Sequence, residues 1–457
     1  MNRMQLMSPT DSMFLIAESR EHPMHVGGLA LYDPPDDAGP EFVRELYEEM
    51  VRHTDFQPVF RKHPATLLGG IANVGWTLDD EVDLDYHLRR SALPSPGRPR
   101  ELLELTSRVH GTLLDRHRPL WEAYLIEGMA DGRFAVYTKV HHSLIDGVSA
   151  MKLVERTLSE DPNDTTVRVP WNLPRRESSR RAGSSSLART ATGAATSLAA
   201  LAPSTIRLAR AALLEQQLTL PFGAPRTMFN VKIGGARRVA AQSWPLERLR
   251  RIKAVTGATI NDIVLAMCAG ALRAYLAEQD ALPDRPLIAM VPVSMRSEHE
   301  ADAGGNMVGS ILCSLGTDVE DPADRLAVIR RSITDNKRVF SELPRLQALA
   351  LSALLIAPLG LTTAFPGFVD ATAPPFNLVI SNVPGPKKPL YWRGARLAGN
   401  YPLSIALDGQ ALNMTVVSNA HNLDFGLVGC RRSVPHLQRL LGHLETSLKD
   451  LETATGA

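Results

Sequence analysis

Hydrophobic and polar residues alternate along residues 134–140, FAVYTKV, a run rich in β-branched and aromatic side chains. Alternation over this length is typical of a β-strand with one buried face. The later run GVSAMKLVERTL, which begins at Gly147, returns its apolar side chains at helical spacing. The pattern therefore predicts a strand and a helix, joined by the short segment HHSLID that begins at His141.

Similar patterns predict elements on both sides of this junction. In the first half we expect a strand at 27–32, GGLALY, and a helix over residues 41–52. In the second half, ERLRRIKAV predicts a helix that ends at Gly257. The run NDIVLAMCAGALRAYLAEQ is apolar on nearly all sides, which predicts a buried helix opened by a capping box over residues 259–262.

The end of the chain predicts a strand, a hairpin and a helix. FNLVI (376–380) is the strand, and ALNMTVVS and LDFGLVGCR flank the turn NAHN (419–422). We expect Ser433 to cap the last helix. The apolar face of that helix is formed by Leu437, Leu440, Leu441, Leu444, Leu448 and Leu451.

The length of 457 residues exceeds one ordinary core and suits two domains. Residues 175–224 separate them. This segment begins with a basic linker rich in Ser, Ala, Gly and Thr and continues as a crossover helix broken near Pro203. We therefore expect an N-terminal domain over 1–174 and a C-terminal domain over 225–457.

One apolar stretch, residues 349–368, approaches the length of a membrane span. Pro358, Gly360 and Pro366 interrupt it, which favours a pair of buried helices. Two alternatives stay open: the stretch lines a tunnel for an aliphatic chain, or it dips into a lipid surface.

Adjacent residues on a strand point to opposite faces, so His141 and His142 cannot both face one substrate atom. His142 would share a face with Val136 and Val140, and His141 with Tyr137 and Lys139. A neutral imidazole at a strand end is what a general base needs near neutral pH. From spacing alone, a structural histidine pair and a catalytic His142 with a structural His141 both remain open.

Asp146 precedes the predicted helix, where its carboxylate can cap the helix or pair with an arginine. Gly147 permits a tight turn and a close backbone approach. The chain contains no HExxH or CxxC, and neighbouring strand histidines diverge, so we expect no metal site. It also contains no GxSxG elbow, GxGxxG or P-loop, so a serine triad and a nucleotide-binding fold have no support.

Composition narrows the class of protein further. The chain has 50 basic and 49 acidic residues, so we expect no nucleic-acid partner. Its three cysteines, Cys268, Cys313 and Cys430, are isolated in apolar surroundings, which indicates small core residues in a reducing compartment. The first residues lack a continuous hydrophobic region and a cleavage pattern, so we expect a cytoplasmic protein.

The segment HHSLIDG matches the HHxxxDG motif of the chloramphenicol acetyltransferase-like acyltransferases, which include the condensation domains of peptide synthetases. Further motifs appear in the order typical of one branch, and from about residue 8 to about residue 450 the chain resembles the bacterial wax ester synthase/diacylglycerol acyltransferase family. These motifs are SPTDSMFL (8–15), HPMHVGGL (22–29), RPLWE (118–122), INDIVLA (260–266), VPVSMR (291–296), GGNMVG (304–309) and SNVPGP (381–386).

The resemblance implies an α/β fold of two acetyltransferase-like sandwich domains that form a pseudodimer with an interfacial channel. It implies transfer of a fatty acyl group from acyl-CoA to a long-chain alcohol or to diacylglycerol, with no metal and no permanently bound cofactor. His142 would then be the general base, and His141 would support it. Asp146 would be structural, held by an arginine for which Arg61 is the candidate, and Gly147 would complete the motif.

The resemblance also suggests residues for substrate binding. Trp121, Asn261, Asn306 and Asn382 are the candidates for the channel, although Trp121 can instead anchor its strand and Asn261 can be an ordinary helix start. Lys387 and Lys388 are the candidates for binding CoA phosphates.

Two other functions fit the same motif. One is a condensation-type acyltransferase that acts on a carrier protein or a glycolipid, and the other is a lipid-droplet protein without catalysis. The complete HHxxxDG argues against the second. We expect peripheral association with the inner membrane or lipid droplets. Five arginines of the linker can contact anionic lipid, although a linker that is only solvated by water is the simpler interpretation: Arg175, Arg176, Arg180, Arg181 and Arg189.

Overall fold

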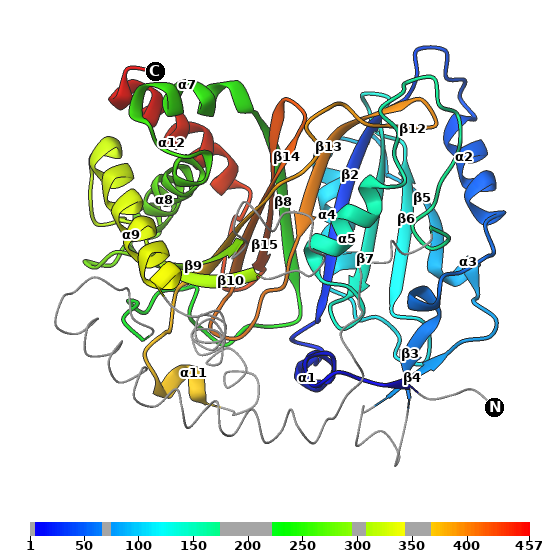
Figure 1. Cartoon of the computed structure of the whole chain (residues 1–457), viewed down its shortest axis with the longest axis horizontal. Coiled ribbons are helices and arrows are strands. Elements are labelled where there is room, and N and C mark those ends of the chain that lie inside the picture. The colour runs from blue at the N-terminus through cyan, green and yellow to red at the C-terminus, as the bar shows by residue number, and fades with distance from the viewer. Residues whose placement is uncertain (1–4, 66–74, 174–221, 295–307, 343–366) are drawn as a thin grey trace.

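Two six-stranded β-sheets form the centre of the molecule, and helices cover their outer faces (Figure 1). The computed structural model describes residues 5–65, 75–173, 222–294, 308–342 and 367–457. A third, three-stranded sheet joins β1 (Gln5–Leu6), β4 (Gly75–Leu78) and β3 (Lys62–Pro64).

The first sheet belongs mainly to the N-terminal half. Its central strand β2 pairs antiparallel with β7, and the Cα register places His25 opposite His141. In spatial order its strands are β12 (Tyr391–Trp392), β13 (Ala395–Leu403), β2 (His25–Asp33), β7 (Phe134–His141), β6 (Trp121–Glu127) and β5 (Leu88–Ala92).

The second sheet belongs to the C-terminal half and mixes parallel and antiparallel pairs. In spatial order its strands are β10 (Val308–Ser314), β9 (Ile288–Ser294), β11 (Leu378–Val383), β14 (Leu412–Asn419), β15 (Asn422–Cys430) and β8 (Arg237–Pro245).

Helices of the N-terminal half lie on both faces of the first sheet. They are α1 (Pro9–Ala17), α2 (Phe42–Val51), the 3-10 turn η1 (Pro58–Arg61), α3 (Leu84–His87), α4 (Pro99–His110) and α5 (Gly147–Glu155). Helices of the C-terminal half form one layer on the second sheet, at the left of Figure 1. They are α7 (Leu246–Thr256), α8 (Ile260–Glu278), α9 (Pro322–Glu342) and α12 (Arg439–Thr455), with the short α11 (Phe368–Ala371) nearby.

The two faces of the first sheet are buried in different cores. Tyr137 and its neighbours on one face belong to the large core shared with α4, the second sheet and α8. Val136 and Val140, on the other face, pack with α2, η1 and α5 in a separate core that contains Trp121. Helix α5 therefore lies on the face of the first sheet that is turned away from the second.

Most described elements agree with the hydrophobic pattern. The strand at 27–32 and the helix at 41–52 are β2 and α2, and 134–140 forms β7. Gly257 ends α7 with a left-handed φ of 66°, and the capping box at 259–262 opens α8. The hairpin about 419–422 is β14 and β15, and the three cysteines are buried and free, as predicted.

Helix α8 is the one helix of the described ranges that is long and apolar enough to cross a membrane by those two criteria. It lies in the core, with 72% of its most apolar stretch buried. Twelve of its 19 residues are buried, which confirms the predicted buried helix.

One expectation for the end of the chain needs correction. The last helix begins at Arg439 after Gln438, so the prediction that Ser433 caps it is wrong. The first sheet draws strands from both halves of the chain, since β12 and β13 extend it beside β2. Strand β13 therefore provides backbone hydrogen-bond partners for the edge of β2 that no strand of the N-terminal half pairs with.

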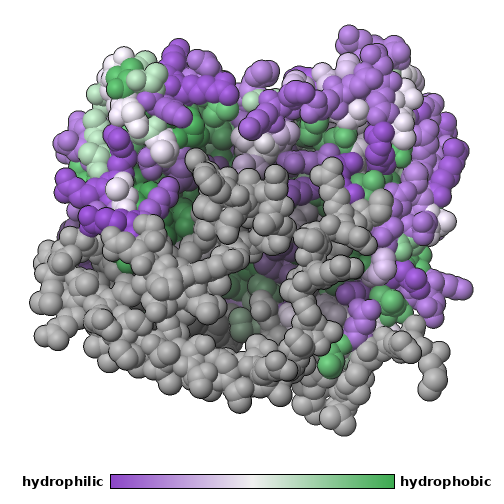
Figure 2. Space-filling view, in the orientation of Figure 1, coloured by the Kyte–Doolittle hydropathy of each residue, from purple (hydrophilic) through white to green (hydrophobic). Residues whose placement is uncertain are grey.

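Several expectations lie outside the described residues. They concern the linker arginines, the crossover helix, most of 349–368, and Asn306. The domain boundaries at 174 and 225 and the channel between the halves also stay predictions. Figure 2 shows polar residues over most of the visible outer surface of the described part.

Candidate active site

The two motif histidines lie where β7 ends. His141 is the last residue of β7, and its backbone N–H donates to Leu120 O at 3.0 Å. His142 lies one residue beyond the strand, and its N–H donates to Met24 O at 2.8 Å. The motifs HPMHVGGL and RPLWE therefore supply the backbone carbonyls that hold the histidine loop in place.

His141 is a buried structural residue with no exposed surface. Its Nδ1 lies 2.5 Å from Ser143 Oγ and accepts the Ser143 N–H at 3.2 Å. Its Nε2 lies 3.3 Å from Glu18 Oε1, which is also buried. Arg116 lies 3.0 Å from the other Glu18 oxygen. The ring of His141 is therefore hydrogen-bonded at Nδ1, and its Nε2 faces the Glu18 carboxylate.

Glu18 is held in its charged form by these neighbours. Burial raises the pKa of Glu18, but the contacts with His141 and Arg116 and the N–H of Met24 outweigh burial and keep the pKa below its ordinary value. A buried carboxylate with an arginine and a histidine beside it is an anchor for the loop and not a free proton donor.

His142 has a different environment. Its imidazole stacks on the ring of Phe14, with 4.2 Å between centroids and 22° between planes. Burial lowers the pKa of His142, although the carboxylates of Asp146 and Asp11 oppose this shift. The imidazole is therefore neutral near pH 7 and can accept a proton, which is the state that a general base requires.

Helix α1 supplies both ring contacts. Phe14 contacts His142, and Glu18, four residues later at the C-cap, contacts His141. Residues four apart lie on one side of a helix, so a single turn of α1 positions both histidines. Ser8 caps this helix by accepting the Asp11 N–H at 3.1 Å, and this explains why the motif SPTDSMFL accompanies the histidine motif.

Asp146 is the N-cap of α5. Its carboxylate accepts the Ser149 N–H at 2.9 Å and the Ser149 Oγ–H at 2.7 Å. The sequence allows Asp146 either to cap the helix or to pair with an arginine, and the structure shows the cap.

The predicted partner of Asp146, Arg61, lies elsewhere. Its Nε donates to Asp79 O at 2.7 Å, and its terminal nitrogen pairs with Asp80 at 3.2 Å. The predicted Asp146–Arg61 pair is therefore wrong, because the turn after η1 directs this arginine to the loop that follows β4.

Gly147 has ample space around it in the structure. A Cβ placed there would meet only Val26 Cγ1, at 4.0 Å, and no left-handed φ is required. Nothing in the described part of the protein therefore requires a glycine at this position, and the role of Gly147 in the motif stays a prediction. In the described residues, Gly147 is the first residue of α5 and follows Asp146, whose carboxylate caps the helix.

Trp121 both anchors its own strand, β6, and lines a cavity. Its Nε1–H donates to Phe60 O at 2.9 Å, and its ring stacks on His87 and Trp171 at centroid distances of 4.5 and 5.3 Å. The same ring forms part of the wall of an apolar cavity under α5. A role in substrate binding stays a prediction.

Two of the three candidate asparagines meet in the second half. Asn382 Nδ2 lies 3.5 Å from Asn261 Oδ1, which links SNVPGP on β11 to the first turn of α8. In the described residues, no hydrogen bond joins this pair to the histidine loop. Asn306 lies outside the described ranges.

The lysines after SNVPGP are exposed. Lys388 Nζ lies 2.6 Å from Glu160 and so connects the two halves, while phosphate binding by Lys387 and Lys388 stays a prediction. Over the ranges described, no group of three or more His, Cys, Asp or Glu side chains is placed to hold a metal ion.

Phe14, Glu18, Ser143 and Arg116 support the histidines and were not predicted. Ser143 carried a local signal, since it is two residues after His141 and its hydroxyl reaches back to the ring. The other three come from distant segments, and only the presence of SPTDSMFL beside HHSLIDG indicated that helix α1 matters.

Comparison with known proteins assigns the chain to a family. Residues 7–264 match the wax ester synthase/diacylglycerol acyltransferase catalytic domain, and residues 304–452 match the C-terminal domain of the same family. A putative diacylglycerol O-acyltransferase of Mycobacterium bovis is 68% identical over 454 residues, which are 99% of this chain and 100% of that protein. A probable diacylglycerol O-acyltransferase of Mycobacterium tuberculosis is equally similar over the same coverage.

Solved structures agree with this assignment. The wax ester synthase/diacylglycerol acyltransferase of Marinobacter aquaeolei has a TM-score of 0.81 and 42% identity, over 99% of this chain and 100% of that one. A starter condensation domain of rhizomide synthetase, at 11% identity and a TM-score of 0.54 over 99% and 95% of the two chains, shares the fold. The predicted α/β fold of two condensation-like domains is thus confirmed, and the chain belongs to the wax ester synthase/diacylglycerol acyltransferase family.

Proposed function

We propose that this acyltransferase moves a fatty acyl group from acyl-CoA to the hydroxyl of diacylglycerol or a long-chain alcohol, with His142 as the general base. The observation that carries the proposal is the contrast between the histidines. His141 is buried, with Nδ1 bonded to Ser143 and Nε2 facing Glu18, whereas the ring of His142 stacks on Phe14 and has a lowered pKa.

The proposed reaction is a direct transfer between two bound substrates. His142 takes the proton of the acceptor hydroxyl as its oxygen attacks the thioester carbonyl, and a tetrahedral intermediate forms. The C–S bond then breaks, and the proton passes from the imidazolium to the CoA sulfur, which leaves as a thiol. Atoms and charge balance without a metal ion or a covalent enzyme intermediate.

The other motif residues act through His142. The Glu18–His141–Ser143 contacts fix the backbone immediately before the base. Asp146 caps α5 and so fixes the backbone after it. We therefore assign both to positioning, since neither needs to exchange a proton for the reaction to balance.

Thiol release tests the proposal directly. Purified protein with palmitoyl-CoA should release CoA when hexadecanol or dipalmitoylglycerol is present and release little without an acceptor. His142→Ala should lower that rate by about 10²–10⁴-fold while palmitoyl-CoA still binds. A correctly folded His142→Ala protein with near-normal turnover would overturn the assignment of the base. The two acceptors, assayed separately, decide which product the enzyme favours.

We further propose that the enzyme works in the cytoplasm at the surface of the inner membrane or of lipid droplets. The three buried free thiols fit a reducing compartment. Met13 and Ile16 are 58% and 74% exposed on α1, the helix that positions His142, so an apolar surface lies beside the proposed site. Such side chains can enter a lipid surface from which the acceptor is taken.

Flotation with anionic liposomes tests this attachment. Binding should weaken as salt rises, and it should weaken further when the five linker arginines become serine. Met13→Ser with Ile16→Ser should also weaken it, whereas Val255→Ser, which changes a 58% exposed residue of α7, should not. Protein that resists extraction by both high salt and carbonate would contradict peripheral attachment.

A further inference from the structure

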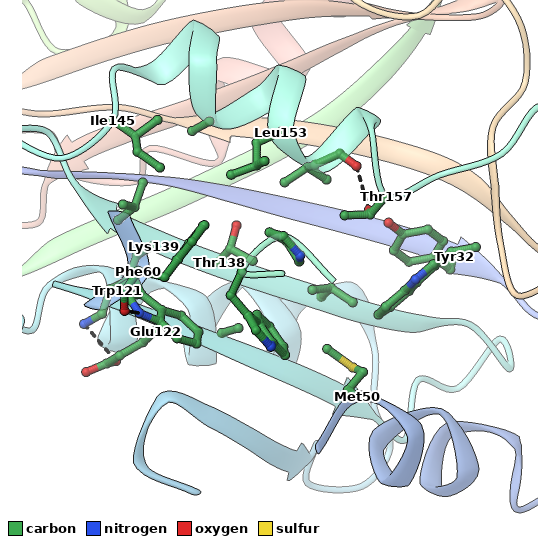
Figure 3. Close-up of a pocket in the computed structure, with 18 residues that line it drawn as sticks. Tyr32, Met50, Phe60, Trp121, Glu122, Thr138, Lys139, Ile145, Leu153 and Thr157 are labelled. Atoms are coloured by element: carbon green, nitrogen blue, oxygen red, sulfur yellow. Dashed lines mark hydrogen bonds and ion pairs between the residues drawn. The ribbon is translucent and has the colours of Figure 1, made fainter. Parts of the chain in front are cut away.

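We propose that the apolar cavity beneath α5 is a subsite for the aliphatic chain of a substrate. The inference rests on the proposed function and adds where a fatty chain lies. The cavity runs between α5 and the face of the first sheet that is turned away from the second sheet (Figure 3).

The wall of the cavity is mostly apolar. Val136 and Val140 of β7, Ile145 of the motif loop, and Ala150 and Leu153 of α5 contribute apolar side chains. Three of the five tryptophans in the chain, Trp121, Trp171 and Trp392, complete the lining. A wall of this kind recognises methylene groups and offers nothing to a phosphate or a sugar.

The charged and indole groups in the wall already have partners, whereas no hydrogen bond among the described residues uses the hydroxyls of Tyr32 and Thr138. Glu122 lies 3.2 Å from Lys139, whose ammonium also donates to the carbonyls of Val109 and Thr112. The hydroxyl of Thr157 donates to Val154 O at 2.6 Å. Apart from these two hydroxyls, the wall offers little that a polar ligand could pair with, which suits an apolar chain.

The position of the cavity suits a chain whose reactive end meets His142. Val140 and Ile145 bracket the segment that carries both histidines, so one end of the cavity lies at the motif loop. Figure 3 shows Ile145 and Lys139 at this end, and Tyr32, Met50 and Thr157 at the other. A chain bound along the cavity would thus point its reactive end toward the loop and its methyl end toward Tyr32.

Helix α5 packs loosely over the cavity. This helix is apolar, yet none of its residues is fully buried, although it covers an apolar sheet face. The open volume is about 70 Å³, which at roughly 10–15 Å³ each would hold about five waters and is too small for a whole palmitoyl chain. We infer that α5 is the wall that moves outward when a long chain enters.

The tryptophans provide a test that does not depend on catalysis. Bromine quenches indole fluorescence on contact, so 12-bromododecanoyl-CoA should quench the full-length protein more than dodecanoyl-CoA does. A second arm with 12-bromododecan-1-ol reports the acceptor chain. Quenching in either arm supports the subsite and identifies which substrate supplies the chain, whereas no quenching in both arms would overturn it.

A cavity-filling variant makes the test specific. Ala150→Phe places a ring in the cavity, and Lys152→Phe adds the same ring at an exposed position of the same helix. Ala150→Phe should remove most of the quenching and lower kcat/KM for palmitoyl-CoA relative to butyryl-CoA by roughly tenfold or more. Lys152→Phe should change neither. Equal quenching in the two variants would also overturn the subsite.

The outcomes separate this inference from the proposed function. Quenching that Ala150→Phe removes, in a protein that never releases CoA thiol, would refute the proposed reaction and keep the chain subsite. Thiol release that proceeds normally without quenching, and with unchanged chain preference in Ala150→Phe, would keep the reaction and refute the subsite.

Discussion

Helices α5 and α8 each cover a face of one of the two sheets, and they are packed in opposite ways. Twelve residues of α8 are buried, and the helix lies inside the largest core of the molecule. No residue of α5 is buried to that degree, and an apolar cavity lies beneath it. The C-terminal half is therefore tightly packed around α8. The N-terminal half, which carries the histidine motif, keeps open space beside its reactive loop.

The rigidity of the motif half is concentrated at a few contacts. Phe14 and Glu18 hold the two histidine rings, and Asp146 holds the start of α5. The rest of α5 contributes little packing. A site that binds a long flexible chain gains from this division, since the reacting groups stay fixed while the wall adjusts.

The largest expected effect compares one leucine from each helix. Leu272→Ala in α8 removes a side chain with no exposed surface and should cost about 2–5 kcal/mol of unfolding free energy. Leu153→Ala in α5 removes a half-buried side chain beside open space and should cost about 1 kcal/mol or less. Urea denaturation measures both, and equal costs would break the comparison.

The sequence predicted the rigid half well, because its signals are local. The Gly257 C-cap and the capping box at 259–262 determine where α7 ends and α8 begins, and apolar residues all round α8 indicate burial. The strand before His141 was equally clear from alternation. In these cases the residues that form an element are adjacent along the chain, so the hydrophobic pattern alone is enough to predict the element.

The contacts around the histidines could not be predicted in the same way. Glu18 reaches His141 and Arg116 across about a hundred residues of chain, and β13 joins β2 from the far end of the sequence. Arg61 was assigned to Asp146 by analogy, but its own loop places it beside Asp80. Side-chain partners of this kind depend on tertiary path, which hydrophobic periodicity does not specify.

The second prediction tests the anchor on His141. His141→Ala leaves the buried Glu18 without one of its partners and should cost about 1–3 kcal/mol of unfolding free energy. It should lower the yield of folded protein more than the rate per folded molecule, whereas His142→Ala should do the reverse. His117→Ala, at an exposed position, is the control. A stable His141→Ala protein would show that the loop does not depend on this contact.

The third prediction concerns the cap of α5. Asp146→Ala removes the acceptor of the Ser149 N–H and should cost about 0.5–2 kcal/mol, with activity falling alongside. Asp146→Asn keeps a capping oxygen and should lose less stability. Thermal melts and thiol release measure the pair. If Asp146→Ala kept its stability and lost only activity, a direct chemical role for this carboxylate would replace the structural one.

The smallest expected effect is a shift in pH dependence. Burial lowers the pKa of His142 below its ordinary value of 6.5, so the base stays neutral at pH 6.5 and activity should fall only at lower pH, as the imidazole becomes protonated. Phe14→Ala removes the stacked ring and admits water, which should raise that pKa toward 6.5 and move the acidic fall in kcat/KM upward by about one pH unit or less. Met13→Ala, at the exposed neighbouring position on α1, should leave the profile unchanged. If Phe14→Ala did not move the pH profile, the loop would bury His142 without help from α1. The rigid part of the N-terminal half would then be the histidine loop alone.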